Sequence, residues 1–293
     1  MLSPETIKKI KQVHIKSGRM VNTIMAGQYR SVFRGSGIEF EEVREYSPGD
    51  EVKNIDWKVS ARLGRPFIKL YREEREQIVV LLLDVSASTN FGTSEQLKRE
   101  TAAEFAAILA FNAIRNNDKV GALLFSDRVE KYIPPKKGSG HVWRVIKEIF
   151  DFKPQRSGTD INSAIGYLGS VCRKRAVAFL ISDFLDQDYQ RPLKTLSRKH
   201  EIIGVLLSDP GDFILPERGL VSVVDFETGK RVLLDAGSKA VCKRYTQVRR
   251  QVYQEARKTL HSSDIDCIEI ATNASVADAL VRFFRYREKR RRR

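Results

Sequence analysis

Five oxygen-bearing side chains stand where strand patterns end or a helix pattern begins. An apolar run ends at Asp84, followed by Ser86 and Ser88; a second run ends at Asp183, and Thr159 precedes a helical pattern. Because parallel strands bring their carboxyl ends to one rim of a sheet, we expect these side chains to converge there. Carboxylate and hydroxyl oxygens, without His or Cys, suit Mg²⁺ or Mn²⁺ rather than zinc. The pattern predicts a Mg²⁺ (or Mn²⁺) site whose ion keeps an open position.

Each of these residues, taken alone, also fits an ordinary structural role. An aspartate at a strand-to-helix turn can cap the helix, and Ser or Thr can serve as a turn residue. The occurrence of all five at three such places favours the ion site. We expect the neighbouring Asp160 to orient the threonine loop without touching the ion. Asp209, which also ends a strand, matches no ligand position and is expected to be a turn residue.

The remainder of the chain after residue 76 alternates strand and helix patterns. Apolar, β-branched runs of strand length occur at 78–83, 120–125, 176–181, 202–207 and 267–270. Runs of this kind are typical of parallel strands buried on both faces. Stretches with helical spacing separate them, the first beginning at a capping box of Thr93 and Gln96. The alternation predicts an α/β fold with a doubly wound, mostly parallel sheet.

The first 75 residues have a different pattern. A helix start at Ser3 precedes strand-like segments at 38–46 and 66–72, separated by Gly and Pro turn residues. We therefore divide the chain into an N-terminal helix plus β-rich subdomain (1–75), an α/β domain (76–288) and a basic tail (289–293). Apolar side chains are too few for an independent core in the subdomain, so we expect it to pack onto the sheet. Asp56, Trp57 and Arg62 are expected to form a buried tryptophan beside an Asp–Arg pair.

Composition narrows the class of protein. The chain has 293 residues, is 42% hydrophobic and carries a formal net charge of +15. No apolar run approaches the roughly 18 to 20 residues of a membrane span, and the start lacks the order of a signal peptide. We expect a cytoplasmic protein without a transmembrane segment and with three reduced cysteines. The basic excess favours an acidic partner, but no nucleic-acid-binding module accompanies it, so nucleic acid is not the expected partner.

The five candidate ligands are similar to the metal-ion-dependent adhesion site (MIDAS) of the von Willebrand factor type A domain. The chain matches all five positions in the family's order, with Asp84-Val-Ser86-Ala-Ser88, Thr159 and Asp183. The resemblance extends over residues 77–287 and implies a Rossmann-like von Willebrand factor type A fold. It also implies that a carboxylate from a protein partner completes the coordination of the ion. An interaction module of this kind is not an enzyme.

The N-terminal part resembles the bacterial domain-of-unknown-function family number fifty-eight. The matching motifs are Gly35-Ser-Gly37-Ile-Glu39-Phe40, Arg44-Glu-Tyr46, Pro48-Gly49-Asp50, Asn54-Ile-Asp56-Trp57 and Ser60-Ala61-Arg62. Bacterial relatives usually act beside a MoxR-type AAA+ ATPase, so the resemblance implies such an ATPase or its client as the partner. The implied role is an adaptor in chaperone-like assembly of proteins or complexes.

Two other functions stay open at the level of sequence. A metal-dependent phosphoryl hydrolase could use the same rim, although no His or Lys stands beside the acidic loops in the sequence to act as a base. A charge-driven nucleic-acid binder would rest on the basic surface alone. Phosphatase turnover and the salt dependence of DNA binding separate these functions from the adaptor.

Overall fold

A computed structural model describes residue 29 and residues 37–74, 76–216, 219–226 and 229–291. The chain divides into two compact units, Phe33–Gln77 and Ile78–Arg293 together with Met1–Val32. The predicted helix that starts at Ser3 lies outside the described residues. The prediction that the N-terminal part packs onto the sheet stays a prediction.

The larger unit is built on a six-stranded sheet with the order β10-β7-β6-β3-β4-β5. Five strands are parallel, and only β5 runs antiparallel, beside β4. The predicted doubly wound, mostly parallel α/β sheet is confirmed. The strands are β3 (Ile78–Asp84), β4 (Lys119–Phe125), β5 (Val129–Lys136), β6 (Val177–Ser182), β7 (Glu201–Ser208) and β10 (Asp266–Ala271).

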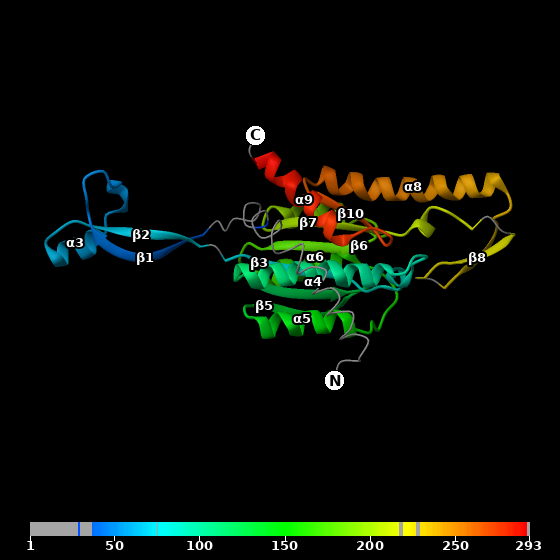
Figure 1. Ribbon diagram of the computed structural model, residues 1–293, viewed down its shortest axis with the longest axis horizontal. Coiled ribbons are helices and arrows are strands. Elements are labelled where there is room, and N and C mark those ends of the chain that lie inside the picture. The colour runs from blue at the N-terminus through cyan, green and yellow to red at the C-terminus, as the bar shows by residue number, and fades with distance from the viewer. Residues whose placement is uncertain (1–28, 30–36, 75, 217–218, 227–228, 292–293) are drawn as a thin grey trace. The chain divides into compact units, whose positions relative to one another are not determined.

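Helices cover both faces of this sheet, as Figure 1 shows. Because successive side chains of a strand point to opposite faces, alternate residues of β3 meet different helices. Val80 and Leu82 join the core cluster that contains residues of α6, α7 and α8. The other face packs against α4, with Phe105 edge-to-face on Phe179, and α4 in turn packs against α5 and α9. The helices are α4 (Lys98–Asn116), α5 (Ser139–Asp151), α6 (Ile161–Val171), α7 (Gln190–Ser197), α8 (Lys239–Ser262) and α9 (Val276–Arg291).

Short elements line the rim at the carboxyl ends of the parallel strands. The single-turn helix η3 (Ala87–Asn90) follows β3, and η4 (Pro210–Asp212) follows β7. A hairpin of β8 (Leu220–Val224) and β9 (Arg231–Asp235) comes between η4 and α8. Figure 1 shows β8 beyond the carboxyl ends of the strands. None of the helices described here is long and apolar enough to cross a membrane.

One local prediction about the larger unit is wrong, and one strand is missing from the predictions. Helix α4 begins at Lys98 and not at Thr93, because Thr93 instead donates to Asp209, a residue distant in sequence. The backbone N–H of Leu97 is satisfied by the Glu100 carboxylate. Strand β5 was not predicted, since it contains Pro134 and Pro135. Proline is tolerated there because β5 is an edge strand of the sheet.

The smaller unit pairs β1 (Gly37–Glu45) with β2 (Phe67–Glu74) in antiparallel fashion, and α3 (Trp57–Leu63) lies between them in sequence. Asp56 caps α3 by accepting from the backbone N–H groups of Lys58 and Val59, and its ion pair is with Lys69. Trp57 is 68% exposed. The predicted buried tryptophan with an Asp–Arg pair is therefore wrong, because Asp56 is engaged as the helix cap.

Candidate metal centre

Asp84 ends the central strand of the sheet with its carboxylate in the interior. The side chain is 1% exposed. Its Oδ1 accepts from the backbone N–H of Ser86 at 2.9 Å, and its Oδ2 accepts from the Ser182 hydroxyl at 2.6 Å. The first bond turns the chain back over the end of β3, and the second ties β3 to the end of β6. Both bonds leave further lone pairs on the carboxylate.

Ser86 and Ser88 bring two more oxygens to the same turn. Their hydroxyls are 3.1 Å apart, and both residues are buried. The hydroxyl of Thr89 donates to the carbonyl of Ser86 at 2.7 Å, which fixes the single turn η3. Asp84, Ser86 and Ser88 therefore form one buried, polar loop at the rim.

Thr159 reaches this loop from another part of the chain. The backbone N–H of Ala87 donates to the carbonyl of Ser157 at 2.9 Å, and that of Asp160 donates to the carbonyl of Ser126 at 2.8 Å. These bonds hold the threonine loop against the ends of β3 and β4. Asp160 also caps α6 by accepting from Ser163 N–H. The Thr159 hydroxyl oxygen is buried and has no hydrogen-bond partner among the described residues.

Asp183 follows β6 and is also buried. Its Oδ2 accepts from the Lys98 ammonium at 3.2 Å, while its Oδ1 is buried without a partner in the described part of the chain. The next residue, Phe184, has a φ of 54°, and its N–H donates to the Ser182 hydroxyl at 3.0 Å. A left-handed conformation at a bulky residue costs about 1–2 kcal/mol, so the turn that sets Asp183 in place is strained.

A buried lysine is the principal feature that sequence reasoning missed. Lys98 is 2% exposed, and its ammonium lies between Asp183 and Asp212, 2.9 Å from Oδ2 of Asp212. Burial lowers the pKa of Lys98, but the charges of the two aspartates outweigh burial and the pKa is raised. Arg249 of α8 also contacts Asp212: it donates to the Asp212 carbonyl at 3.2 Å and pairs with the Asp212 carboxylate at 3.5 Å. Lys98 is therefore charged and joins the candidate site to α8.

The carboxylates of the two predicted acidic ligands lie in a buried site with little positive charge around them. Burial raises the pKa of Asp84 to about 7, and the nearby charge of Asp183 adds to the shift, against hydrogen bonds from Ser182 and Ser86 that lower it. Lys98 is shared between Asp183 and Asp212, so it neutralises only part of the local negative charge. A divalent cation beside Asp84 and Asp183 would favour both ionised forms.

The donor set fits a hard cation. Among the residues that the structure describes, no group of three or more His, Cys, Asp or Glu could hold a metal, so a site here depends on hydroxyl oxygens as well. Two of the five predicted ligands present buried oxygens without partners, the Thr159 hydroxyl and Asp183 Oδ1. Buried polar atoms are nearly always satisfied, and binding of an ion is one explanation for such exceptions. The assignment of the five residues as ligands stays a prediction.

Asp209, which was expected to be only a turn residue, also connects several loops. It is fully buried and accepts from the Thr93 backbone N–H, the Gly211 backbone N–H, and the Thr93 and Thr272 hydroxyls. Burial raises the pKa of Asp209, but these hydrogen bonds outweigh it and the pKa is lowered. The carboxylate ties the loops that follow β3, β7 and β10 to one another. Its hydrogen bonds are structural.

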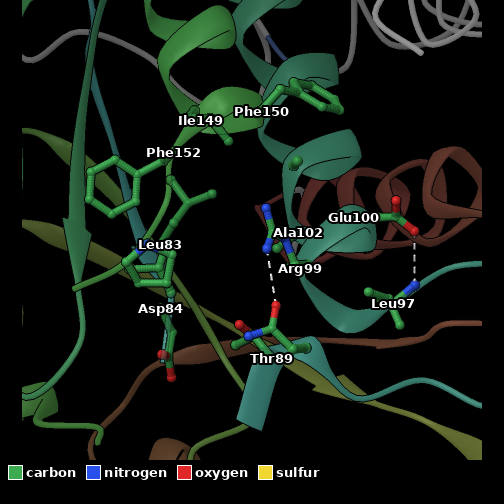
Figure 2. Close-up of a pocket in the computed structure, with 14 residues that line it drawn as sticks. Leu83, Asp84, Thr89, Leu97, Arg99, Glu100, Ala102, Ile149, Phe150 and Phe152 are labelled. Atoms are coloured by element: carbon green, nitrogen blue, oxygen red, sulfur yellow. Dashed lines mark hydrogen bonds between the residues drawn. The ribbon is translucent and has the colours of Figure 1, made fainter. Parts of the chain in front are cut away.

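A cavity of about 200 Å³ lies behind Asp84, between the end of β3, the start of α4 and the end of α5. Figure 2 shows that the Asp84 carboxylate points away from Ile149 and Phe152, which line this cavity. Arg99 donates to the Asn90 side chain there at 3.1 Å, and Glu100 is bonded to Leu97. Of the five predicted ligands, only Asp84 lines this cavity, so the cavity is not the candidate metal centre.

Comparison with solved structures gives weak similarity. The BatB protein of Bacteroides thetaiotaomicron has a TM-score of 0.49 and 15% identity, covering 73% of this chain and 99% of BatB. An aerotolerance-related membrane protein of Bacteroides fragilis has a TM-score of 0.47 and 16% identity, with the same coverage. The mussel proximal thread matrix protein 1, in a structure with a zinc-occupied MIDAS motif, has a TM-score of 0.36 and 16% identity, covering 45% of this chain and 38% of that protein. The fold assignment therefore rests on the sheet topology itself.

Sequence comparison gives a family. The uncharacterized proteins Mb1516 of Mycobacterium bovis and Rv1480 of Mycobacterium tuberculosis are each 30% identical over 229 residues, which is 77% of this chain and 72% of the relative. The family model described as "Protein of unknown function DUF58" matches residues 42–255, which include all five predicted ligands. This chain belongs to the DUF58 family.

Proposed function

We propose that the chain is a metal-ion-dependent protein-interaction adaptor. The observation that supports it is the pair of buried oxygens without partners, Thr159 Oγ1 and Asp183 Oδ1, beside the buried loop of Asp84, Ser86 and Ser88. Mg²⁺ (or Mn²⁺) is the proposed ion, because every candidate ligand is a hard oxygen. The chain supplies two charged and three neutral ligands, one fewer than the six that Mg²⁺ prefers, so a position stays open for an external carboxylate.

The function of the ion in this proposal is to bind a partner and not to activate water. The chain's own residues hold the site rigid: Ser182 fixes Asp84, and Lys98 fixes Asp183. Rigid, prearranged ligands lower the entropy lost on binding. The proposed partner is a protein that presents Asp or Glu, either a MoxR-type AAA+ ATPase or its client, and the proposed process is chaperone-like assembly.

The ion is tested by thermal melting of the full chain in Mg²⁺ and in EDTA. Wild type is expected to melt higher in Mg²⁺, since a ligand that binds only the native state stabilises it by RT ln(1 + [L]/Kd). Asp84→Asn is expected to lose this shift. Asp264→Asn is the matched control, because Asp264 is exposed in the loop between α8 and β10, at the amino ends of the strands, with a φ of 56° that Asn also adopts. Equal melting of wild type in Mg²⁺ and EDTA would remove the ion from the proposal.

The adaptor role is tested by binding between the full chain and a purified MoxR-type ATPase from the same organism. Binding is expected in Mg²⁺, with loss in EDTA and in Asp84→Asn, and retention in Asp264→Asn. Binding that survives EDTA would show that the ion does not hold the partner. Turnover of p-nitrophenyl phosphate that requires Asp84 would favour the hydrolase instead.

A further inference from the structure

A second cavity, of about 540 Å³, opens beside the candidate metal centre. Ser88 lines it and is also a predicted metal ligand, so the two features share a wall. The other walls come from the residue after η3, the start of α4, the β8–β9 hairpin and α8. Its volume is within the range of small-ligand pockets. A group bound to an ion at the candidate centre would therefore lie next to this cavity.

The wall formed by η3 and the hairpin is apolar. Phe91 follows η3, and its ring centroid lies 6.0 Å from that of Phe226, which follows β8. Val232 of β9 lines the same cavity and is 56% exposed, and Phe226 is 43% exposed. Exposed apolar side chains that gather around one hollow mark a binding surface more often than scattered ones do.

Charged side chains make up another part of the lining. Lys98, Lys230 and Arg249 line the cavity together with Asp212 and Asp225, and both Lys98 and Arg249 pair with Asp212. The Lys98 ammonium lies 5.6 Å from the centre of the Phe91 ring, so the cationic and apolar walls meet.

From this arrangement we propose that the cavity binds a large apolar side chain of the partner segment whose Asp or Glu reaches the ion. The inference rests on the proposed function and adds the sequence class of the partner: an acidic residue with an aromatic or large aliphatic residue close to it. In an extended peptide, side chains two residues apart lie on the same side, about 6.6 Å from each other. A residue two positions from the carboxylate can therefore enter the adjoining cavity.

The test uses a soluble acetylated heptapeptide with a central aspartate, a phenylalanine two residues before it and another two residues after it, and glycine elsewhere. Having phenylalanine on both sides makes the direction of binding immaterial. The comparison peptides replace both phenylalanines by alanine, or the aspartate by asparagine. Affinity for the full chain is measured by saturation-transfer NMR in Mg²⁺ and in EDTA. The phenylalanine peptide is expected to bind roughly ten to a hundredfold more tightly than the alanine peptide, because one large apolar side chain is buried.

Two variants of β9 make a matched pair. Val232 lines the cavity, whereas Leu233, its neighbour, does not and is 69% exposed. Adjacent strand residues point to opposite faces, so Val232→Asp and Leu233→Asp add the same charge to opposite sides of the hairpin. Val232→Asp is expected to abolish the preference for phenylalanine and leave the Mg²⁺-dependent melting shift intact. Leu233→Asp is expected to leave both intact.

The outcomes separate this inference from the proposed function. Equal binding of the phenylalanine and alanine peptides, each requiring Mg²⁺ and aspartate, would overturn the cavity's role and leave the adaptor standing. Binding of the phenylalanine peptide that is the same in EDTA, or with asparagine, would overturn the ion as the anchor. If the phenylalanine peptide does not bind in Mg²⁺ while the melting shift is present, the inferred partner class is wrong.

Discussion

The ammonium of Lys98 lies 3.2 Å from Oδ2 of Asp183, in an interior where the lysine side chain is 2% exposed. The Asp183 carboxylate, which we propose holds a divalent cation, thus already pairs through one oxygen with the ammonium of Lys98. Its other oxygen has no partner among the residues described. A positive charge so close weakens the attraction for a second cation, but it also holds Asp183 in the folded structure when no ion is bound. If Asp183 holds the proposed ion, Lys98 would set a balance between stability without the ion and affinity for it.

Lys98→Met is expected to destabilise the ion-free protein and increase its response to Mg²⁺. Breaking a buried ion pair by removing one partner costs about 3–5 kcal/mol, because Asp183 and Asp212 are left with uncompensated charge. That same charge attracts a divalent ion more strongly. Urea unfolding in EDTA and in Mg²⁺ measures both effects.

Lys131→Met is the matched control, since the Lys131–Glu148 pair is partly exposed, at 37% and 28%. It is expected to cost less than about 1 kcal/mol and to leave the Mg²⁺ response unchanged. If Mg²⁺ stabilises Lys98→Met no more than it stabilises wild type, Lys98 does not weaken the binding of the ion.

The central strands could be predicted from sequence because their apolar runs leave few alternatives. The β3 segment has six consecutive apolar residues before Asp84, which suits only an element buried on both faces. Strand β5 lacks that signal: most of its residues are partly exposed, and Pro134 and Pro135 disfavour a strand in the sequence. Only its position at the edge of the sheet makes the two prolines acceptable.

Lys98 could not be predicted because lysine is almost never fully buried. Its partners are 85 and 114 residues away in sequence, so no local pattern shows them. Four of the five predicted ligands, by contrast, follow strand patterns and Thr159 precedes a helix pattern, so a common rim is expected for them without any knowledge of packing. Asp209 shared that position at a strand end, yet its partners Thr93 and Thr272 are visible only in the folded chain.

Asp209→Asn is expected to destabilise the protein by about 2–4 kcal/mol at neutral pH, because an amide cannot accept all the hydrogen bonds that the carboxylate accepts. The pKa of Asp209 is lowered in the folded state, so its contribution is fully present above the unfolded pKa of about 4 and is lost as the pH falls through the lower, folded value. The difference between wild type and Asp209→Asn in the free energy of unfolding should therefore shrink below about pH 4. A difference that is constant between neutral and acidic pH would contradict this account.

Gly121→Ala is expected to destabilise the sheet by about 1–3 kcal/mol, since the added methyl overpacks the core. A Cβ there would lie 2.7 Å from the carbonyl oxygen of Ile133 and 2.8 Å from the ring of Pro135, on the neighbouring strand β5. Gly166→Ala in α6 meets nothing within 4 Å and is the control. It should stabilise by about 0.5–1 kcal/mol through helix propensity. Equal effects of the two substitutions in urea unfolding would contradict the close approach of β5.

Thr159→Val is expected to have opposite effects with and without the ion. The Thr159 hydroxyl oxygen is buried without a partner in the described structure, and leaving such a group unsatisfied costs about 1–3 kcal/mol. Valine has nearly the same shape and lacks the hydroxyl, so the variant should unfold in EDTA at the same or a higher urea concentration than wild type. In Mg²⁺ it should be the less stable of the two, because a ligand of the ion is missing.

Thr101→Val tests whether the opposite effects in EDTA and in Mg²⁺ are specific to Thr159. The Thr101 hydroxyl is also in the interior, but it donates to the carbonyl of Leu97 at 3.2 Å. Its loss should cost about 1 kcal/mol, equally in EDTA and in Mg²⁺, since the bond has nothing to do with the ion. If Thr159→Val instead keeps the full Mg²⁺ stabilisation of wild type, Thr159 is not a ligand, and its buried hydroxyl has to be explained without a metal.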